Sequence, residues 1–149
     1  MTELPSYRKI LVATDGSDTA DLAVLHAISL ARQTGATLVA TAVVDTHAAF
    51  GAGIHRDDVV REELADARRA VERVEGLARE HGVAVLADVA EGRTGDTIVE
   101  LAAEHDADLI FVGSHGQGNL ADVILGSVSQ HVLRHARAPV CIVRPAHSA

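Results

Sequence analysis

The sequence predicts a single α/β domain built on a parallel β-sheet, and three observations support this fold class. Short runs of β-branched residues alternate along the chain with stretches whose apolar residues recur at helical spacing. The strand-like runs are mostly continuous, as expected for strands that helices cover on both faces. A length of 149 residues with 48% hydrophobic residues fits one globular domain, residues 1–149, with a substantial core. Such alternation implies right-handed crossovers between parallel strands.

Five segments are predicted to be strands because they are short, apolar and rich in valine and isoleucine. They are residues 10–13, 37–44, 83–89, 109–112 and 140–143.

The first helix follows from an apolar stripe over residues 20–31 that repeats at i, i+3, i+4 and i+7. Ser17 or Asp18 is the predicted N-cap, because short polar side chains accept hydrogen bonds from the first turn. Gly35 lies just past the stripe, where a glycine commonly ends a helix.

Three further helices are predicted from the same periodicity, over residues 60–78, 94–102 and 127–136. Gly82 ends the second of them. At the start of the last, Ser127 and Gln130 have the spacing of a capping box, in which each side chain bonds the backbone at the other residue.

The segment between the fourth strand and the fourth helix carries the strongest functional pattern. Its glycines follow the spacing G-x2-G-x9-G-S, which begins at Gly113, continues at Gly116 and ends at Gly126. Glycines let a ligand lie against backbone N–H groups, and a helix N-terminus adds unpaired N–H donors and a positive dipole end. The pattern predicts a phosphate cradle, with the hydroxyls of Ser127 and Ser129 at the helix start.

Two better-known phosphate motifs are excluded. The dinucleotide fingerprint G-x-G-x-x-G should follow the first strand, where this chain has Asp15-Gly-Ser instead. A Walker A loop needs Gly-Lys-Ser/Thr, and the single lysine of the chain is Lys9, far from the glycines.

Composition excludes other classes of function. The net charge of −8 opposes binding to nucleic acids, and 2% aromatic residues provide no platform for stacking bases. No apolar run approaches the length of a membrane span. Cys141 is the single cysteine, which predicts a buried small hydrophobic residue and fits a reducing cytoplasm.

Histidines are numerous, but they do not predict a metal site. His131 and His135 have the i, i+4 spacing of two ligands on one helix face, yet no third ligand is evident. Solvated surface side chains are therefore expected. His115 lies inside the glycine-rich segment, where it could contact a phosphate or only fill space.

The glycine spacing resembles the nucleotide-binding signature of the universal stress protein family, and the resemblance extends over nearly the whole chain. Residues 9–17 resemble the first strand and acidic turn of that family, residues 41–45 its second strand end, and residues 107–116 and 138–144 its last two strands. Residues 46–56, predicted to form a mobile loop or lid, lack a clear counterpart.

The resemblance implies an open twisted, Rossmann-like sheet with strand order 3-2-1-4-5. Ligands of such sheets bind at the carboxyl ends of the strands, where the order reverses. In this order the reversal falls between the first and fourth strands, which end near Asp15 and Gly113. The site expected from topology therefore coincides with the site expected from the glycines.

The resemblance also implies individual roles. Asp15 would face the nucleoside, unless it only caps the first helix, and Val43 would pair with adenine through its backbone. Val112 would pack against the base or sugar, and Ser127 and Ser129 would contact the outer phosphates. The full set of expected nucleotide-binding residues is Ala13, Thr14, Asp15, Val43, Val112, Gly113, Gly116, Gly126, Ser127, Val128 and Ser129.

The function implied is that of a cytoplasmic stress-response module that binds ATP, or AMP or ADP. Mg²⁺ would be held by phosphate oxygens and water, without a dedicated protein site. Two alternatives stay open: a slow ATPase at the same site, although no nucleophile and base pair is evident, and a scaffold that binds no nucleotide. A homodimer is expected, because the apolar last strand at 140–143 would be an exposed sheet edge unless it is paired.

Overall fold

The computed structural model describes residues 2–47, 53, 55–116 and 125–145. Strands and helices alternate strictly along this part of the chain. In chain order they are β1 (Lys9–Ala13), α1 (Asp18–Thr34), β2 (Thr37–Val44), α2 (Arg56–Glu80), β3 (Val85–Glu91), α3 (Thr94–Glu104), β4 (Leu109–Gly113), α4 (Ser127–His135) and β5 (Val140–Val143).

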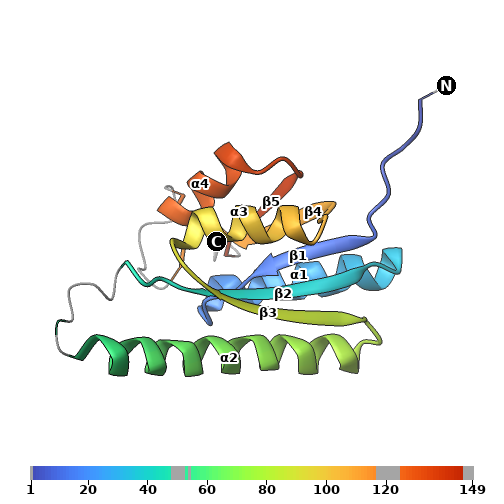
Figure 1. Cartoon of the computed structure of the whole chain (residues 1–149). Coiled ribbons are helices and arrows are strands. Elements are labelled where there is room, and N and C mark those ends of the chain that lie inside the picture. The colour runs from blue at the N-terminus through green and yellow to red at the C-terminus, as the bar shows by residue number, and fades with distance from the viewer. Residues whose placement is uncertain (1, 48–52, 54, 117–124, 146–149) are drawn as a thin grey trace.

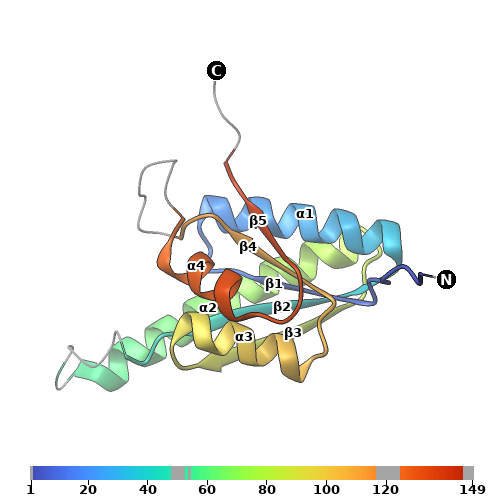
Figure 2. The same cartoon turned by 90° about the horizontal axis from the view of Figure 1, so that it is seen from above.

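The five strands form one parallel sheet in the order β3-β2-β1-β4-β5, which confirms the predicted fold class and strand order. Helices α1 and α2 cover one face of the sheet, and α3 and α4 cover the other (Figures 1 and 2). The order reverses between β1 and β4, so the crossovers on either side of this point run in opposite directions. The carboxyl ends of β1 and β4 therefore meet where no crossover covers them.

The core is divided by the sheet into two apolar layers. Ile10 and Val12 of β1 pack toward α1 and α2, whereas Leu11 between them packs toward α3 and α4. All three side chains have 0% exposed surface. Burial on both faces explains why the strand sequences are continuously apolar rather than alternating.

The ends of α1 and α2 show how local sequence sets the element boundaries. Ser17 caps α1 by accepting a hydrogen bond from the N–H of Ala20 at 3.2 Å, and Gly35 ends it with a left-handed φ of 74°, as predicted. The predicted start of β3 was two residues too early. Val83 is buried, but its N–H donates to the carbonyl of Ala78 at 2.9 Å, so it completes the end of α2 rather than starting a strand.

The predicted mobile loop at 46–56 lies largely outside the described residues. Among the residues that the structure describes, no helix is long and apolar enough to cross a membrane.

Strand β5 lies at the edge of the sheet, and its burial differs from the prediction. Cys141 was expected to be buried, but it is only half-buried, because no described segment covers the outer edge of β5. Partial burial still raises the pKa of the Cys141 thiol, since desolvation disfavours the thiolate.

We expect Cys141 to be a slow nucleophile at neutral pH. Because the thiolate is the reactive form, the rate of alkylation by iodoacetamide should rise with a midpoint above the value of about 8.5 for a free cysteine. Mass spectrometry of the labelled protein across the alkaline pH range measures this midpoint, and the urea-unfolded chain is the control. A folded-state midpoint at or below that of the unfolded chain would contradict the expectation.

Candidate functional site

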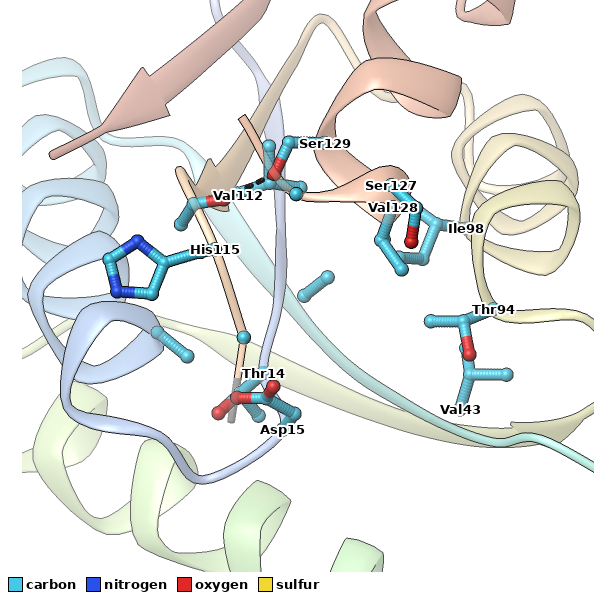
Figure 3. Close-up of a pocket in the computed structure, with 15 residues that line it drawn as sticks. Thr14, Asp15, Val43, Thr94, Ile98, Val112, His115, Ser127, Val128 and Ser129 are labelled. Carbon is cyan, nitrogen blue, oxygen red and sulfur yellow. Dashed lines mark hydrogen bonds between the residues drawn. The ribbon is translucent and has the colours of Figure 1, made fainter. Parts of the chain in front are cut away.

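A cavity of about 360 Å³ opens at the carboxyl ends of β1 and β4, where the strand order reverses. Its volume lies at the lower end of the range of about 300–1,000 Å³ that is typical of small-molecule sites. Figure 3 shows its side chains arranged around one central space, with contributions from the strand ends and from the first turns of α1, α3 and α4.

All eleven residues that the sequence assigns to a nucleotide line this cavity. They are Ala13, Thr14, Asp15, Val43, Val112, Gly113, Gly116, Gly126, Ser127, Val128 and Ser129. Ala20, Thr94, Ile98 and His115 complete the lining. Residues more than 100 positions apart in the chain are thus brought together by the meeting of β1, β2 and β4.

The start of α4 presents unpaired backbone donors to the cavity. Gly126 is the N-cap, and no side chain caps the helix, so the predicted capping box is wrong. The side-chain Nε2 of Gln130 instead donates to the carbonyl of Leu125 at 2.7 Å. The first hydrogen bond within the helix joins the N–H of Gln130 to the carbonyl of Gly126. Within the described part of the chain, the three preceding N–H groups, of residues 127–129, therefore have no acceptor.

Ser129 connects α4 to the end of β4. Its hydroxyl lies 2.6 Å from the carbonyl oxygen of Gly113 and 3.2 Å from that of Ser114, and its surface is only 3% exposed. The N–H of Gly126 also donates to the carbonyl of Ser114, at 2.7 Å. The hydroxyl of Ser129 is therefore engaged with the strand end, whereas Ser127 is exposed at the first position of the helix.

The three glycines of the G-x2-G-x9-G-S spacing accommodate close approach of neighbouring atoms rather than unusual backbone angles. None of Gly113, Gly116 and Gly126 has a positive φ. A Cβ on Gly113 would lie 2.9 Å from Cγ2 of Thr19 and 3.2 Å from its backbone, and a Cβ on Gly116 would lie 2.5 Å from Oδ2 of Asp15. Glycine thus lets the loop after β4 contact the loop after β1.

Asp15 shapes the turn that leads into α1. Its Oδ1 accepts from the N–H of Ser17 at 2.9 Å, and Ser17 in turn caps the helix. The other carboxylate oxygen faces Gly116 across the junction of the two loops. Asp15 is exposed and is the one carboxylate in the cavity lining, which contains no lysine or arginine among the described residues.

His115 is held against α1. Its Nε2 lies 3.2 Å from the hydroxyl of Thr19, and its Nδ1 lies 3.2 Å from the hydroxyl of Ser114. Figure 3 shows the ring directed toward α1 and away from Ser127 and Val128. Of the two roles left open by the sequence, the geometry favours packing between two elements over contact with a ligand.

Val43 presents backbone polar groups to the opposite end of the cavity. The carbonyl of Thr41 faces β1, since it accepts from the N–H of Thr14 at 2.9 Å. Val43 is two residues further along the strand, so its N–H and C=O face the same side. The paired register of β1 ends at Ala13 opposite Thr41. In the described chain, no strand residue therefore pairs with the cavity side of Val43.

The histidines of α4 are not all solvated, which corrects the sequence prediction. His131 is half-buried, and its Nε2 lies 2.6 Å from Oδ1 of Asp96 on α3. The ring of His135 lies 4.3 Å from that of His131, measured between centroids. No group of three or more potential metal ligands occurs among the described residues.

The sequence did not indicate that Thr94 and Ile98 line the site, because their position there depends on how α3 crosses from β3 to β4. Ile98 was recognised as a helical core position, and Thr94 as the start of a helix, but neither carries a motif. The signal that could have found them is topological: α3 covers the same face as α4, so its first turn must reach the shared cavity.

The chain belongs to the universal stress protein family, whose sequence profile matches residues 6–144. A relative, the universal stress protein MJ0531 of Methanocaldococcus jannaschii, is 35% identical over 140 residues, which cover 93% of this chain and 82% of the relative. Another, YxiE of Bacillus subtilis, is 35% identical over 147 residues, or 93% and 99% of the two chains.

Solved structures share the fold. The structure of MJ0577, also from Methanocaldococcus jannaschii, superposes with a TM-score of 0.87 at 26% identity and covers 97% of this chain and all of its own. A universal stress protein in complex with cAMP superposes with a TM-score of 0.72 at 28% identity, covering 94% and 98% of the two chains.

We expect Gly113→Ala to lower the free energy of unfolding even in the absence of a ligand. The new methyl group would be forced against the backbone of Thr19, and such overpacking costs about 1–3 kcal/mol. Urea denaturation followed by circular dichroism measures the loss. Gly76→Ala on α2 is the matched control: nothing lies within 4 Å of its Cβ position, so it should stabilise the helix by about 0.5–1 kcal/mol. Equal changes in the free energy of unfolding for the two variants would contradict the expected overpacking at Gly113.

Proposed function

We propose that this chain is an adenine-nucleotide-binding module and that its physiological ligand is ATP, with ADP or AMP binding at the same place. The observation that carries the proposal is the start of α4, where three backbone N–H groups without described acceptors lie at the wall of a cavity of about 360 Å³. Such groups, together with the positive end of the helix dipole, are the usual protein ligands of a phosphate.

The base is proposed to lie at the end of the cavity formed by Val43. A strand N–H and C=O that face the same side offer a donor and an acceptor, which suits N1 and N6 of adenine. Guanine has the opposite pattern on this edge and would leave both groups unpaired. The family member whose structure was solved with cAMP is consistent with an adenine-containing ligand.

The phosphates are proposed to lie between the signature glycines and the first turn of α4. The described lining offers them backbone N–H groups and the exposed hydroxyl of Ser127, but no lysine or arginine. Mg²⁺ would then supply the missing positive charge, held by phosphate oxygens and water. The residues present fit this arrangement, because the cavity lining combines the N–H groups at the start of α4 with the exposed hydroxyl of Ser127.

Binding rather than hydrolysis is proposed as the activity. The imidazole of His115 is a candidate base in the cavity lining. Both of its ring nitrogens, however, lie within hydrogen-bond distance of hydroxyl groups that hold it against α1. Without a base aimed at a water molecule, hydrolysis would be slow.

We place the protein in the cytoplasm, because a single half-buried free thiol fits a reducing compartment.

A homodimer is proposed through β5. The carbonyls of Pro139 and Val143 face β4, because they accept from Ile110 and Ser114. By alternation, the backbone groups of Val140 and Ile142 face the outer edge. Antiparallel pairing with a second copy would satisfy these groups and cover the half-buried side chains of the strand.

We expect ATP binding to fail when the signature glycines gain side chains. Gly116→Val would displace the carboxylate of Asp15, and Gly126→Val would crowd the backbone of His115, which lies 3.3 Å from the new Cβ. Each should weaken ATP binding more than tenfold. Ser127→Ala removes one hydroxyl and should cost about 1 kcal/mol, or about fivefold in Kd. Isothermal titration calorimetry with Mg²⁺ measures these affinities, and circular dichroism verifies the fold.

Two controls accompany this titration. Gly76→Val is the same substitution on the outer face of α2, and it should leave the Kd unchanged. GTP should bind the wild-type protein more weakly than ATP, because each unpaired buried group costs about 1–3 kcal/mol. Folded glycine variants that bind ATP like the wild type, or equal affinities for ATP and GTP, would refute the placement of the nucleotide.

We expect Ile142→Pro to convert the dimer to a monomer without unfolding it. The substitution removes an N–H that faces the outer edge and leaves the hydrogen bonds to β4 in place. Light scattering at micromolar concentration should give a dimer for the wild type and a monomer for the variant. A wild-type monomer, or a dimer that persists in the folded variant, would exclude this interface.

A further inference from the structure

Helix α4 carries the phosphate-binding donors, but it is a short element. It spans nine residues, and isolated helices of this length are marginal in water. Its position must therefore come from its neighbours. Ser129 attaches it to β4 on one side, and on the other side it packs mainly on α3, which lies beside it in both views (Figures 1 and 2).

The contact between α3 and α4 is unusually close and contains an ion-pair geometry. Nε2 of His131 lies 2.6 Å from Oδ1 of Asp96, with side chains 34% and 51% exposed. The imidazole lies directly over the backbone of Gly95, where a Cβ would be 2.8 Å from two ring atoms. His135 packs against the ring of His131. Glycine at position 95 thus permits a contact that any side chain would obstruct.

This contact lies next to the cavity on both helices. Asp96 is two residues from Thr94, and His131 is two residues from Ser129, and both Thr94 and Ser129 line the cavity. A change in the distance between the two helices at this level would therefore also move two of the cavity walls. Neutral imidazole with its proton on Nε2 and protonated imidazole can both donate to Asp96.

We infer that Asp96 and His131 clamp α3 to α4 and thereby set the width of the nucleotide cavity, which makes His131 a positioning residue for the phosphate-binding turn. The inference rests on the proposed function and adds to it the contact that holds the turn in place. His131 itself is not among the residues that line the cavity, so it acts through the position of α4.

The chain contains a matched control for this clamp. Nε2 of His105 lies 2.8 Å from Oδ2 of Asp88, and this pair joins the other end of α3 to β3. It has the same chemistry and is somewhat more buried, with side chains 22% and 35% exposed, and neither residue lines the cavity. A purely structural effect of losing a histidine–aspartate pair should be the same at both places.

The test compares Mg²⁺–ATP affinity with thermal stability in the same variants. His131→Ala and Asp96→Ala should each weaken ATP binding about three- to tenfold. Because the two residues act as one unit, the double variant should bind ATP no more weakly than the single variant with the larger loss of affinity. His131→Gln, whose amide can still donate to Asp96, should restore most of the affinity. His105→Ala should lower the Tm about as much as His131→Ala and leave the Kd within about twofold of wild type.

The outcomes separate the two proposals. A wild-type chain that binds no adenine nucleotide overturns the proposed function, and this inference with it. If the wild type binds ATP but His131→Ala binds equally well, only the clamp is overturned. Additive losses in the double variant, or an equal loss of affinity in His105→Ala, also overturn the clamp, because they show independent or merely structural effects.

Discussion

The reversal of strand order between β1 and β4 is the constraint on which the rest of this structure depends. Because the crossovers on either side of that point run in opposite directions, the ends of the two strands are left uncovered and open into one cavity. The loops that follow them must then pass close to each other. Gly113 and Gly116 meet that demand, since a side chain at either position would collide with Thr19 or Asp15.

The polar groups around the cavity separate into those that build it and those that remain available. The hydroxyl of Ser129 and the imidazole of His115 are engaged with β4 and α1, so they maintain the geometry. In the described chain, the N–H groups at the start of α4 have no acceptor, and no strand residue pairs with the N–H and C=O of Val43 on the cavity side. A ligand with a hydrogen-bonding base at one end and phosphates at the other would satisfy both sets.

This division explains how a chain with a net charge of −8 could hold an anionic ligand. In the proposed function, attraction would come from oriented backbone dipoles at short range, because the described lining contains no lysine or arginine side chain. Such dipoles must be placed accurately, because they cannot move toward the ligand as a long side chain can. Under the proposed function, contacts remote from the ligand, such as those between α3 and α4, would then influence affinity.

The sequence by itself predicted the fold class and the number of strands, because burial on both faces makes the strands continuously apolar. Its resemblance to the universal stress protein family implied the strand order and eleven of the fifteen residues that line the cavity, among them the glycines at which two loops approach each other closely. Tertiary structure alone decided the start of β3 after Val83, the uncapped start of α4, and the pairing of His131 with Asp96. Each of these depends on which distant residue is available as a hydrogen-bond partner, and no local pattern encodes that choice.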